Sequence, residues 1–408
     1  MNEHIIIIGA GHAGVQAAAS LREEGYEGRL TLISGDPELP YHKPPLSKAF
    51  LKAADAQPQM LRAQAFYDTQ KIELLKGRRV TSVKPRPHTL TLDDGSQLHW
   101  SKLLLATGAK PRRLAVPGAD LAGVFYLRDC ADAARLRDAL ATAQKLVVIG
   151  GGFIGLEVAA TAAMAGRRVD VVEAAERILG RAVSPTIARH LHAYHESLGV
   201  GISTGCGVAE LRSEEGKLRS VLTSDGQELD ADLVLVGIGA LPETELAEKA
   251  GLVCDNGIHV DASCRTSLED IYAIGDCVSF RYLSPERVLR LESVQNATDQ
   301  ARIAAKAMLG KEAFYDAVPW FWSDQGERKL QMAGLSLDAD REVIAGDPHS
   351  AAFGVYLYSG ERLVAVETVN RPGEHMMARR MLAAGFSPPV ETVLEGPAAL
   401  KAAMAASQ

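Results

Sequence analysis

Ile5-Ile6-Ile7-Ile8-Gly9-Ala10-Gly11-His12-Ala13-Gly14 is the stretch that decides the fold, and Leu146-Val147-Val148-Ile149-Gly150-Gly151-Gly152-Phe153-Ile154-Gly155 repeats its pattern. Each copy has an apolar run before its glycines and an alanine-rich segment after them. In such a strand–turn–helix unit the first glycine permits the tight turn, the second lets a pyrophosphate approach and the third lets the helix pack on the sheet. The amino terminus of the helix then attracts the phosphates. The two copies predict two dinucleotide sites and a protein that passes electrons between them.

The first fingerprint is predicted to bind FAD through Gly9, Gly11 and Gly14. Asp36 lies just past the next predicted strand, Leu30–Ser34, where an acid can bind an adenosine ribose. The flavin assignment rests on Asp276, which follows a predicted strand and precedes a helix, so that it can bind the ribitol chain. Taken alone, Asp276 is equally well explained as a turn residue at a helix terminus.

The second fingerprint is predicted to bind NADH through Gly150, Gly152 and Gly155. Glu173 ends the next predicted strand, where an acid accepts hydrogen bonds from the ribose hydroxyls of NADH and repels the 2′-phosphate of NADPH. The presence of Arg177 keeps NADPH as an alternative, because its guanidinium could bind the 2′-phosphate. The predicted cofactor-binding set is completed by Ile154, inside the fingerprint, and Gly239, at the end of the predicted strand Val234–Gly239.

Composition narrows the class of protein. A chain of 408 residues with 47% hydrophobic and 23% charged residues is typical of a globular protein with two or three domains. The net charge of −7 makes nucleic acid an unexpected partner. The apolar runs are of strand length, far short of the ~20 residues of a membrane helix. The first residues run directly into a strand, which leaves no room for a signal peptide, so a cytoplasmic location is expected.

The cysteines predict no disulfide scaffold and no thiol relay. Five cysteines occur, with no C-x-x-C pair, which favours reduced thiols. Disulfide reductases of this architecture carry a cysteine pair on or just beyond the first helix, but residues 36–52 contain none. Cys277, beside Asp276, is interpreted as a small buried apolar residue. Electrons are therefore expected to leave the flavin directly to a partner.

The order of predicted elements indicates an α/β fold with an additional carboxy-terminal domain. Two Rossmann-like dinucleotide-binding domains are expected, with residues 1–110 and 243–318 in the FAD-binding domain and 111–242 in the NADH-binding domain. Residues 319–408 alternate short strands, such as those at 355–358 and 363–366, and then form a helix over about 374–384. This pattern predicts a small α+β domain.

Four further motifs carry a resemblance to a known family. They are Pro44-Pro45-Leu46-Ser47-Lys48, the fingerprint extended through Leu156-Glu157-Val158-Ala159-Ala160, Glu292-Ser293-Val294-Gln295-Asn296-Ala297 and Pro319-Trp320-Phe321-Trp322-Ser323-Asp324-Gln325. The chain resembles the FAD-dependent, NADH-linked ferredoxin reductases of oxygenase and cytochrome P450 systems, the putidaredoxin reductase-like proteins. The resemblance runs from His4 to about Pro372, and the first and last of these motifs are the most specific to the family.

The resemblance implies a glutathione-reductase-like fold of three domains and a set of site residues. Lys48 is expected near the flavin N5, paired with Glu157, and Trp320 near the flavin edge, and these three are the candidate catalytic residues. The sequence alone is equally consistent with purely structural roles, in which Lys48 is a surface residue, Glu157 lies on a helix face and Trp320 packs in the core. The family's FAD contacts fall on Ala13, Asp36, Lys48, Val80, Arg128, Asp276 and Val294.

The resemblance also implies a partner. NADH would give a hydride to the flavin, which would pass single electrons to a [2Fe–2S] ferredoxin in a transient complex. Arg302 is expected at the docking face, and Gln295 in a loop close to it. The segment 281–311 has six basic residues against Glu286, Glu292 and Asp299, which favours an acidic partner. An ordinary solvated helix face explains the same charges.

Several alternatives stay open at this stage. A rubredoxin reductase would use the same fold and the same first step with a mononuclear iron acceptor. An NADH oxidase is less favoured because the active-site cysteine is missing. An NADH-sensing flavoprotein of the apoptosis-inducing-factor type would use NADH to change its assembly, but the long targeting segment and insertion of those proteins are absent. A monomer or weak homodimer without a membrane partner is expected.

Overall fold

The computed structural model describes residues 3–180, 182–282 and 287–406. The chain divides into two compact units, each assembled from separate segments. The first unit contains Met1–His42, Pro58–Lys110 and Ala240–Ala317, and the second contains Lys43–Gln57, Pro111–Gly239 and Val318–Gln408. Each glycine fingerprint therefore lies in its own unit, and residues 43–57 belong with the second fingerprint.

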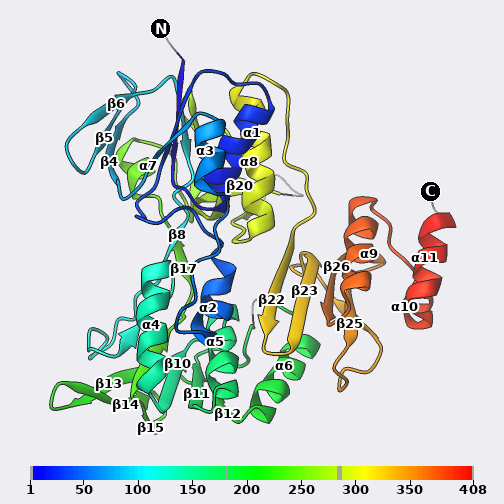
Figure 1. The fold of residues 1–408 in the computed structure, drawn as a ribbon. Helices are drawn as coiled ribbons and strands as arrows, with labels where there is room; N and C mark the ends of the chain where they lie inside the picture. The colour runs from blue at the N-terminus through cyan, green and yellow to red at the C-terminus, as the bar shows by residue number, and fades with distance from the viewer. Residues whose placement is uncertain (1–2, 181, 283–286, 407–408) are drawn as a thin grey trace. The chain divides into compact units, whose positions relative to one another are not determined.

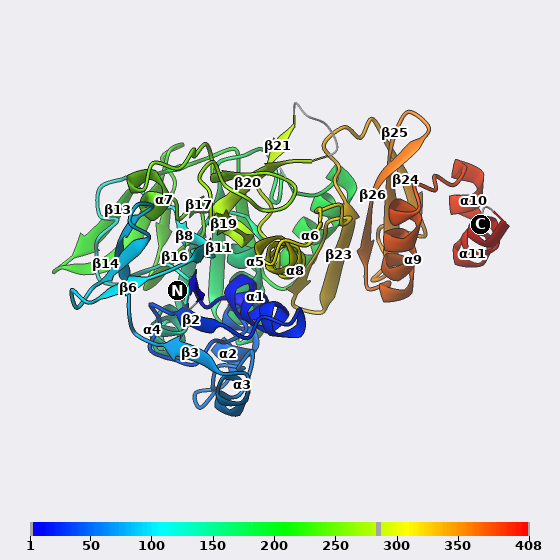
Figure 2. The same ribbon diagram turned by 90° about the horizontal axis from the view of Figure 1, so that it is seen from above.

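The first unit is built on a parallel sheet with the strand order β19-β7-β1-β2-β3. β1 (His4–Ile8) is central and buried along its whole length, as a continuous apolar run in a parallel sheet predicts. Helices α1 (His12–Glu23) and α8 (Val294–Met308) lie side by side in Figures 1 and 2, and both bury a row of alanines that permits close packing. The other strands are β2 (Arg29–Ile33), β3 (Ile72–Leu75), β7 (Lys102–Leu105) and β19 (Ile271–Ala273).

Smaller elements complete the first unit. The antiparallel strands β4 (Val80–Lys84), β5 (Thr89–Leu92) and β6 (Gln97–His99) form a separate small sheet. A second small sheet joins β18 (Ile258–Val260), β20 (Val278–Arg281) and β21 (Val288–Leu289). The remaining elements are α3 (Gln64–Thr69), α7 (Glu245–Lys249), η2 (Gly275–Cys277) and the paired strands β8 (Ala109–Pro111) and β17 (Ala240–Pro242).

The expectation that Gln295 lies in a loop is wrong. Gln295 is the second residue of α8 and is 4% exposed, with its Nε2 donating to Asp299 Oδ2 at 2.6 Å. The helix begins this early because Ser293 caps it, its hydroxyl accepting a hydrogen bond from the Asn296 N–H at 3.0 Å.

The second unit repeats the parallel α/β arrangement. Its larger sheet has the order β12-β11-β10-β16-β9, with β10 (Lys145–Ile149) at the centre. Helix α5 (Phe153–Met164) follows the second glycine turn and is buried along most of its length. The other elements of this part are β9 (Val124–Phe125), β11 (Arg168–Glu173), β12 (Val200–Thr204), β16 (Leu233–Val236), α4 (Cys130–Thr142), α6 (Pro185–Ser197), η1 (Pro44–Ser47) and α2 (Ala49–Lys52). A small sheet of β13 (Val208–Glu214), β14 (Lys217–Thr223) and β15 (Glu228–Asp230) is attached to it.

The carboxy-terminal part of the second unit is an antiparallel sheet with the order β22-β23-β26-β25-β24. Its strands are β22 (Trp320–Gln325), β23 (Arg328–Gly334), β24 (Arg341–Ala345), β25 (Phe353–Ser359) and β26 (Arg362–Val369). Helix α9 (Pro372–Ala383) packs against this sheet, as Figure 2 shows. The small α+β domain is thus confirmed. It also contains α10 (Val390–Glu395) and α11 (Pro397–Ala406), which were not predicted and in which the buried residues are Val393 and Leu400.

Within the described ranges, the helices are all too short or too polar to cross a bilayer.

Candidate functional site

The first glycine turn has the geometry that a dinucleotide phosphate requires. Gly9 has φ +106°, and a Cβ placed on it would lie 2.1 Å from the Ala106 carbonyl oxygen. A Cβ on Gly14 would lie 1.8 Å from the Gly9 oxygen, whereas a Cβ on Gly11 would meet nothing within 4 Å. Two glycines are therefore required by the protein's own packing, and the third leaves backbone open beside the amino terminus of α1.

The second glycine turn has the same geometry. Gly150 also has φ +106°, with a Cβ position 2.4 Å from the Gly237 oxygen, and a Cβ on Gly155 would lie 2.4 Å from the Gly150 oxygen. The counterpart of Gly11 is Gly152, whose Cβ would come no closer than 3.9 Å to any atom. Each unit thus presents an open backbone edge at a helix terminus, which fits the pyrophosphate of a dinucleotide.

The structure brings most of the predicted FAD residues together within the first unit. Gly275 is next to the α1 residue Ala13, because a Cβ on Gly275 would lie 3.1 Å from the Ala13 Cβ. Asp276 follows in η2, which packs against the start of α8, where Val294 is the first helical residue. The segments that carry Ala13, Asp276 and Val294 therefore converge at one edge of the parallel sheet.

Asp36 follows β2 in the same unit. Its Oδ2 accepts a hydrogen bond from the Tyr41 hydroxyl at 2.5 Å, and its Oδ1 accepts one from the Glu38 N–H at 3.2 Å. Its backbone carbonyl accepts from the Gly77 N–H at 3.0 Å, which brings the chain leading to Val80 and β4 alongside it. Each carboxylate oxygen can accept more than one hydrogen bond, so the ribose role of Asp36 stays a prediction.

Two residues that the resemblance assigns to FAD, Lys48 and Arg128, belong to the second unit. The Lys43 ammonium donates to the Arg128 carbonyl at 3.2 Å, so residues 43–57 are attached to the chain just before α4. The Arg128 N–H donates to Asp132 Oδ2 at 3.0 Å, and Asp132 also takes part in the capping box of α4.

Glu173 is the last residue of β11, as predicted for the acid of an NADH site. Its Oε2 accepts a hydrogen bond from the Gly151 N–H at 2.6 Å, and its Oε1 accepts one from the Ala175 N–H at 2.8 Å. The carboxylate is therefore tied to the glycine turn, and its ribose role stays a prediction. Arg177 donates to the Val183 and Gly180 carbonyls at 3.0 and 2.8 Å, so its guanidinium is held by its own loop.

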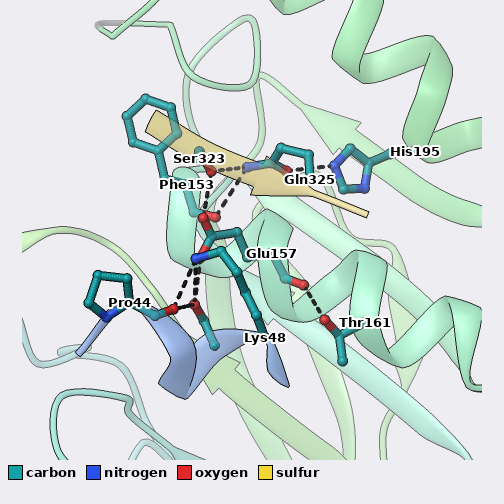
Figure 3. A network of polar contacts seen from close by, with 9 residues as sticks. Pro44, Lys48, Phe153, Glu157, Thr161, His195, Ser323 and Gln325 are labelled. Atoms are coloured by element: carbon teal, nitrogen blue, oxygen red, sulfur yellow. Dashed lines mark hydrogen bonds and ion pairs between the residues drawn. The ribbon is translucent and has the colours of Figure 1, made fainter. Parts of the chain in front are cut away.

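A buried ion pair joins the first motif of the resemblance to helix α5 (Figure 3). The Lys48 ammonium lies 2.7 Å from Glu157 Oε2, and the two side chains are 18% and 6% exposed. Glu157 Oε2 also accepts from the Ser47 hydroxyl at 2.5 Å, and its Oε1 accepts from Ser323 at 2.6 Å. Three donors therefore satisfy the hydrogen-bonding capacity of the Glu157 carboxylate within an otherwise apolar helix.

The network continues to residues that had no predicted role, as Figure 3 shows. Gln325 Nε2 donates to Ser323 Oγ at 2.8 Å, and Gln325 Oε1 accepts from His195 Nε2 at 2.9 Å. Burial lowers the pKa of His195. The proton in this contact is on Nε2, because the Gln325 oxygen can only accept. The two-residue period of a strand places Ser323 and Gln325 on one face of β22, and that alternation within the quoted motif was the available signal.

Trp320 lies on the opposite side of β22 from Ser323 and packs under α9. Its ring centroid is 5.8 Å from that of His375, and the Arg379 guanidinium lies over the ring at 4.5 Å. The core role that the sequence also allowed is thus present in the structure, and the placement of Trp320 at the flavin edge stays a prediction.

Several basic side chains of the segment 281–311 are paired with acids, so the segment carries less free positive charge than its count of six basic and three acidic residues indicated. Arg302 is 54% exposed and pairs with Asp299 at 2.7 Å. Lys306 and Lys311 both approach Glu24, at 3.9 and 2.8 Å, an acid at the end of α1 that a count over 281–311 leaves out. Arg290 pairs with Glu292, and Glu286 lies outside the described residues.

The cysteines give no redox pair. All five are free thiols, and Cys277 is fully buried with its Sγ 3.2 Å from the Ile274 carbonyl. Burial raises the pKa of the Cys277 thiol. The interpretation of Cys277 as a small buried residue is therefore confirmed.

Comparison with known proteins defines the class. Residues 3–301 match the family described as pyridine nucleotide-disulphide oxidoreductase, and residues 320–404 match the reductase C-terminal family. The rhodocoxin reductase of Rhodococcus erythropolis is 44% identical over 93% of this chain and 89% of its own. A rubredoxin–NAD(+) reductase of Pseudomonas putida is 41% identical over 90% of this chain and 96% of its own. Putidaredoxin reductase, solved in a covalent complex with putidaredoxin, matches with a TM-score of 0.94 and 39% identity over 99% of each chain.

The duplicated fold and its two phosphate turns thus define a dinucleotide-dependent flavoprotein oxidoreductase. The chain belongs to the pyridine nucleotide-disulphide oxidoreductase family, in the group of ferredoxin reductase-like members that carry the reductase C-terminal domain. Its cofactors are FAD and NAD(H), in agreement with the expectation from the two fingerprints.

Proposed function

We propose that this chain is an NADH-dependent ferredoxin reductase that supplies electrons to a cytochrome P450 or another oxygenase. The observation that carries the proposal is the match to putidaredoxin reductase over 99% of both chains, a protein solved in a covalent complex with putidaredoxin. The lack of a C-x-x-C motif and the free state of all five thiols support direct electron transfer to a partner instead of a disulfide relay.

When bound, FAD and NADH would supply the redox chemistry, a two-electron reduction of the flavin followed by the release of single electrons. The backbone of the first glycine turn would hold the FAD pyrophosphate, with Asp36 at the ribose and Asp276 at the ribitol chain. Lys48 would supply positive charge that favours the anionic reduced cofactor, and Glu157, 2.7 Å from its ammonium, would moderate that charge. The protein needs no general acid or base of its own for these electron transfers.

Nucleotide selectivity is assigned to Glu173. Its carboxylate stands at the end of β11, fixed by the N–H groups of Gly151 and Ala175, and it would accept hydrogen bonds from the ribose hydroxyls of NADH. Arg177 is engaged with two carbonyls of its own loop, which supports NADH over NADPH.

The test is NADH-driven reduction of cytochrome c by the purified FAD-loaded protein, with and without an added [2Fe–2S] ferredoxin. Strong dependence on the ferredoxin would support the proposal. Reduction of the flavin by NADH without any dependence on ferredoxin would reject the acceptor but keep the NADH–FAD half of the reaction.

A rubredoxin is the second candidate acceptor, because a rubredoxin–NAD(+) reductase is 41% identical to this chain. The same assay, repeated with a rubredoxin in place of the ferredoxin, distinguishes the two acceptors, because the physiological acceptor should give the higher kcat/KM.

Arg302 is proposed as a docking residue. Arg302→Glu should therefore raise the KM for an acidic ferredoxin at low salt, and an unchanged KM would remove Arg302 from the docking surface.

A cytoplasmic location is proposed from the five free thiols, because disulfides are rare in that compartment.

A further inference from the structure

A short segment of the second unit, which we call the strap, lies on the second glycine turn. It comprises residues 174–180 and 182–184, between β11 and α6. The Leu179 N–H donates to the Gly151 carbonyl at 2.9 Å, and Ile178 is fully buried. A Cβ on Gly151 would lie 2.9 Å from the Ile178 Cγ2, so the strap is in direct contact with the turn.

The strap also fixes the acid at the ribose position. Ala175, its second residue, donates its N–H to Glu173 Oε1, and the Gly205 N–H donates to the Ala175 carbonyl at 2.8 Å. Arg177 binds the Gly180 and Val183 carbonyls and so closes the strap on itself. A shift of the far end of the strap would therefore be transmitted to Gly151 and Glu173.

The far end of the strap is held by a residue of the carboxy-terminal sheet. Both carboxylate oxygens of Glu367, on β26, lie at hydrogen-bond distance from the Ser184 N–H, at 3.1 and 3.0 Å. Glu367 is 2% exposed and Ser184 is 4% exposed. Ser184 is also the N-cap of α6, its hydroxyl accepting from the Ile187 N–H at 3.4 Å.

Neighbouring contacts show that the Ser184–Glu367 hydrogen bond is one of several between the first turns of α6 and the carboxy-terminal sheet region. Next to Ser184, the Thr186 hydroxyl donates to Glu342 on β24 at 2.5 Å, and His190 Nδ1 donates to the Pro348 carbonyl at 2.8 Å. Burial raises the pKa of Glu367 to about 7, although its hydrogen bonds with Ser184 act in the opposite direction. A carboxyl group kept in such an unfavourable environment, with Ser184 as its hydrogen-bond partner, indicates a positional role for Glu367 rather than a favourable packing contact.

We propose that Glu367 is a positioning residue for the NAD(H) site, acting through Ser184 and the strap on Gly151 and Glu173. This inference rests on the proposed binding of NAD(H) at the second fingerprint. It gives the carboxy-terminal domain a function in nucleotide binding in addition to any part in partner docking.

The experiment compares Glu367→Met, which keeps the length of the side chain but removes the acceptor, with Glu367→Gln, which keeps one acceptor oxygen. The matched control is Glu374→Met, at a residue of α9 that is 6% exposed and paired with Arg371 at 2.7 Å instead of with Ser184. NAD⁺ binding to the FAD-loaded proteins is measured by calorimetry, the exchange of backbone amides over 174–184 by mass spectrometry, and kcat and KM for NADH with ferricyanide as acceptor.

Glu367→Met should weaken NAD⁺ binding about tenfold and speed amide exchange across the strap, whereas Glu367→Gln should stay within about threefold of the wild type. The KM for NADH should rise with kcat little changed, because the loss is in binding. Glu374→Met should leave NAD⁺ affinity and strap exchange unchanged, even if the protein becomes less stable.

Equal effects of Glu367→Met and Glu374→Met on NAD⁺ affinity, or wild-type affinity and exchange in Glu367→Met, would overturn the inference. If Glu367→Met does not fold, Glu367→Leu takes its place under the same criteria. Failure of the wild-type protein to bind NAD⁺ or to be reduced by NADH would instead reject the proposed function, so the two failures are distinguishable.

Discussion

Removal of the Glu157 carboxylate should destabilise the second unit by about 3 kcal/mol. Loss of one partner of a buried ion pair costs about 3–5 kcal/mol, because the other charge is left without compensation. Lys48 is 18% exposed and keeps a hydrogen bond to the Pro44 carbonyl at 3.0 Å, which places Glu157→Ala at the lower end of that range. For a unit of this size, the loss corresponds to a fall in Tm of about 6–12 °C.

The assay is thermal unfolding in saturating FAD, followed by tryptophan fluorescence. Two of the three tryptophans, Trp320 and Trp322, lie on β22 beside Ser323, so the signal reports on the part of the protein that carries the ion pair. The matched control is Thr161→Ala, one turn further along α5, which removes a methyl group and a hydroxyl that donates to the Glu157 backbone carbonyl at 2.9 Å. That control should cost about 1 kcal/mol or less.

A double-mutant cycle separates the ion pair from the packing of its members. Lys48→Met combined with Glu157→Leu should cost less than the sum of the two single changes by at least about 1 kcal/mol, because the double variant leaves neither charge unpaired. The reasoning is refuted if Glu157→Ala unfolds within about 1 kcal/mol of the wild type, or if the two single changes are simply additive.

Three further predictions follow from individual residues. Gly9→Ala should prevent accumulation of FAD-loaded protein, measured as bound flavin per chain, because Gly9 has φ +106° and the new Cβ would lie 2.1 Å from the Ala106 oxygen. The control is Gly25→Ala, which should retain flavin because φ is +95° there but the new Cβ would meet no atom within 4 Å. Burial lowers the pKa of His375 from 6.5 to about 4, so the unfolded chain binds this proton more tightly than the folded protein does. The free energy of unfolding should therefore fall by up to about 3 kcal/mol as the pH drops from 6.5 to 4. Urea unfolding at several pH values should show that slope, and His375→Phe should flatten it; an equal slope in the variant would contradict the assignment. Glu173→Ala should lower kcat/KM for NADH about tenfold and lower that for NADPH much less, and equal losses for the two nucleotides, measured by steady-state kinetics, would show that Glu173 does not select between them.

The sequence could predict the two phosphate turns because their geometry is a local property. A backbone with positive φ and a carbonyl about 2 Å from the Cβ position admits only glycine, so Gly9 and Gly150 reveal their conformation by their identity. The apolar strands before them and Glu173 at the end of β11 follow from patterns within about thirty residues. The Lys48–Glu157 pair was expected only through the resemblance, since the two residues are 109 positions apart.

The tertiary structure alone decided which polar residues far apart in the sequence contact one another, because no local sequence pattern pairs them. Ser323 and Glu157 are 166 positions apart, His195 and Gln325 are 130 apart, and Ser184 and Glu367 are 183 apart. Each partner by itself is an ordinary strand, helix or loop residue. Their meaning depends on burial, because a polar group removed from water must find a partner wherever the packing of distant segments supplies one. The sequence by itself determined which cofactors the chain can hold, and the packing of the carboxy-terminal sheet on α5 and α6 determined which of these polar side chains meet.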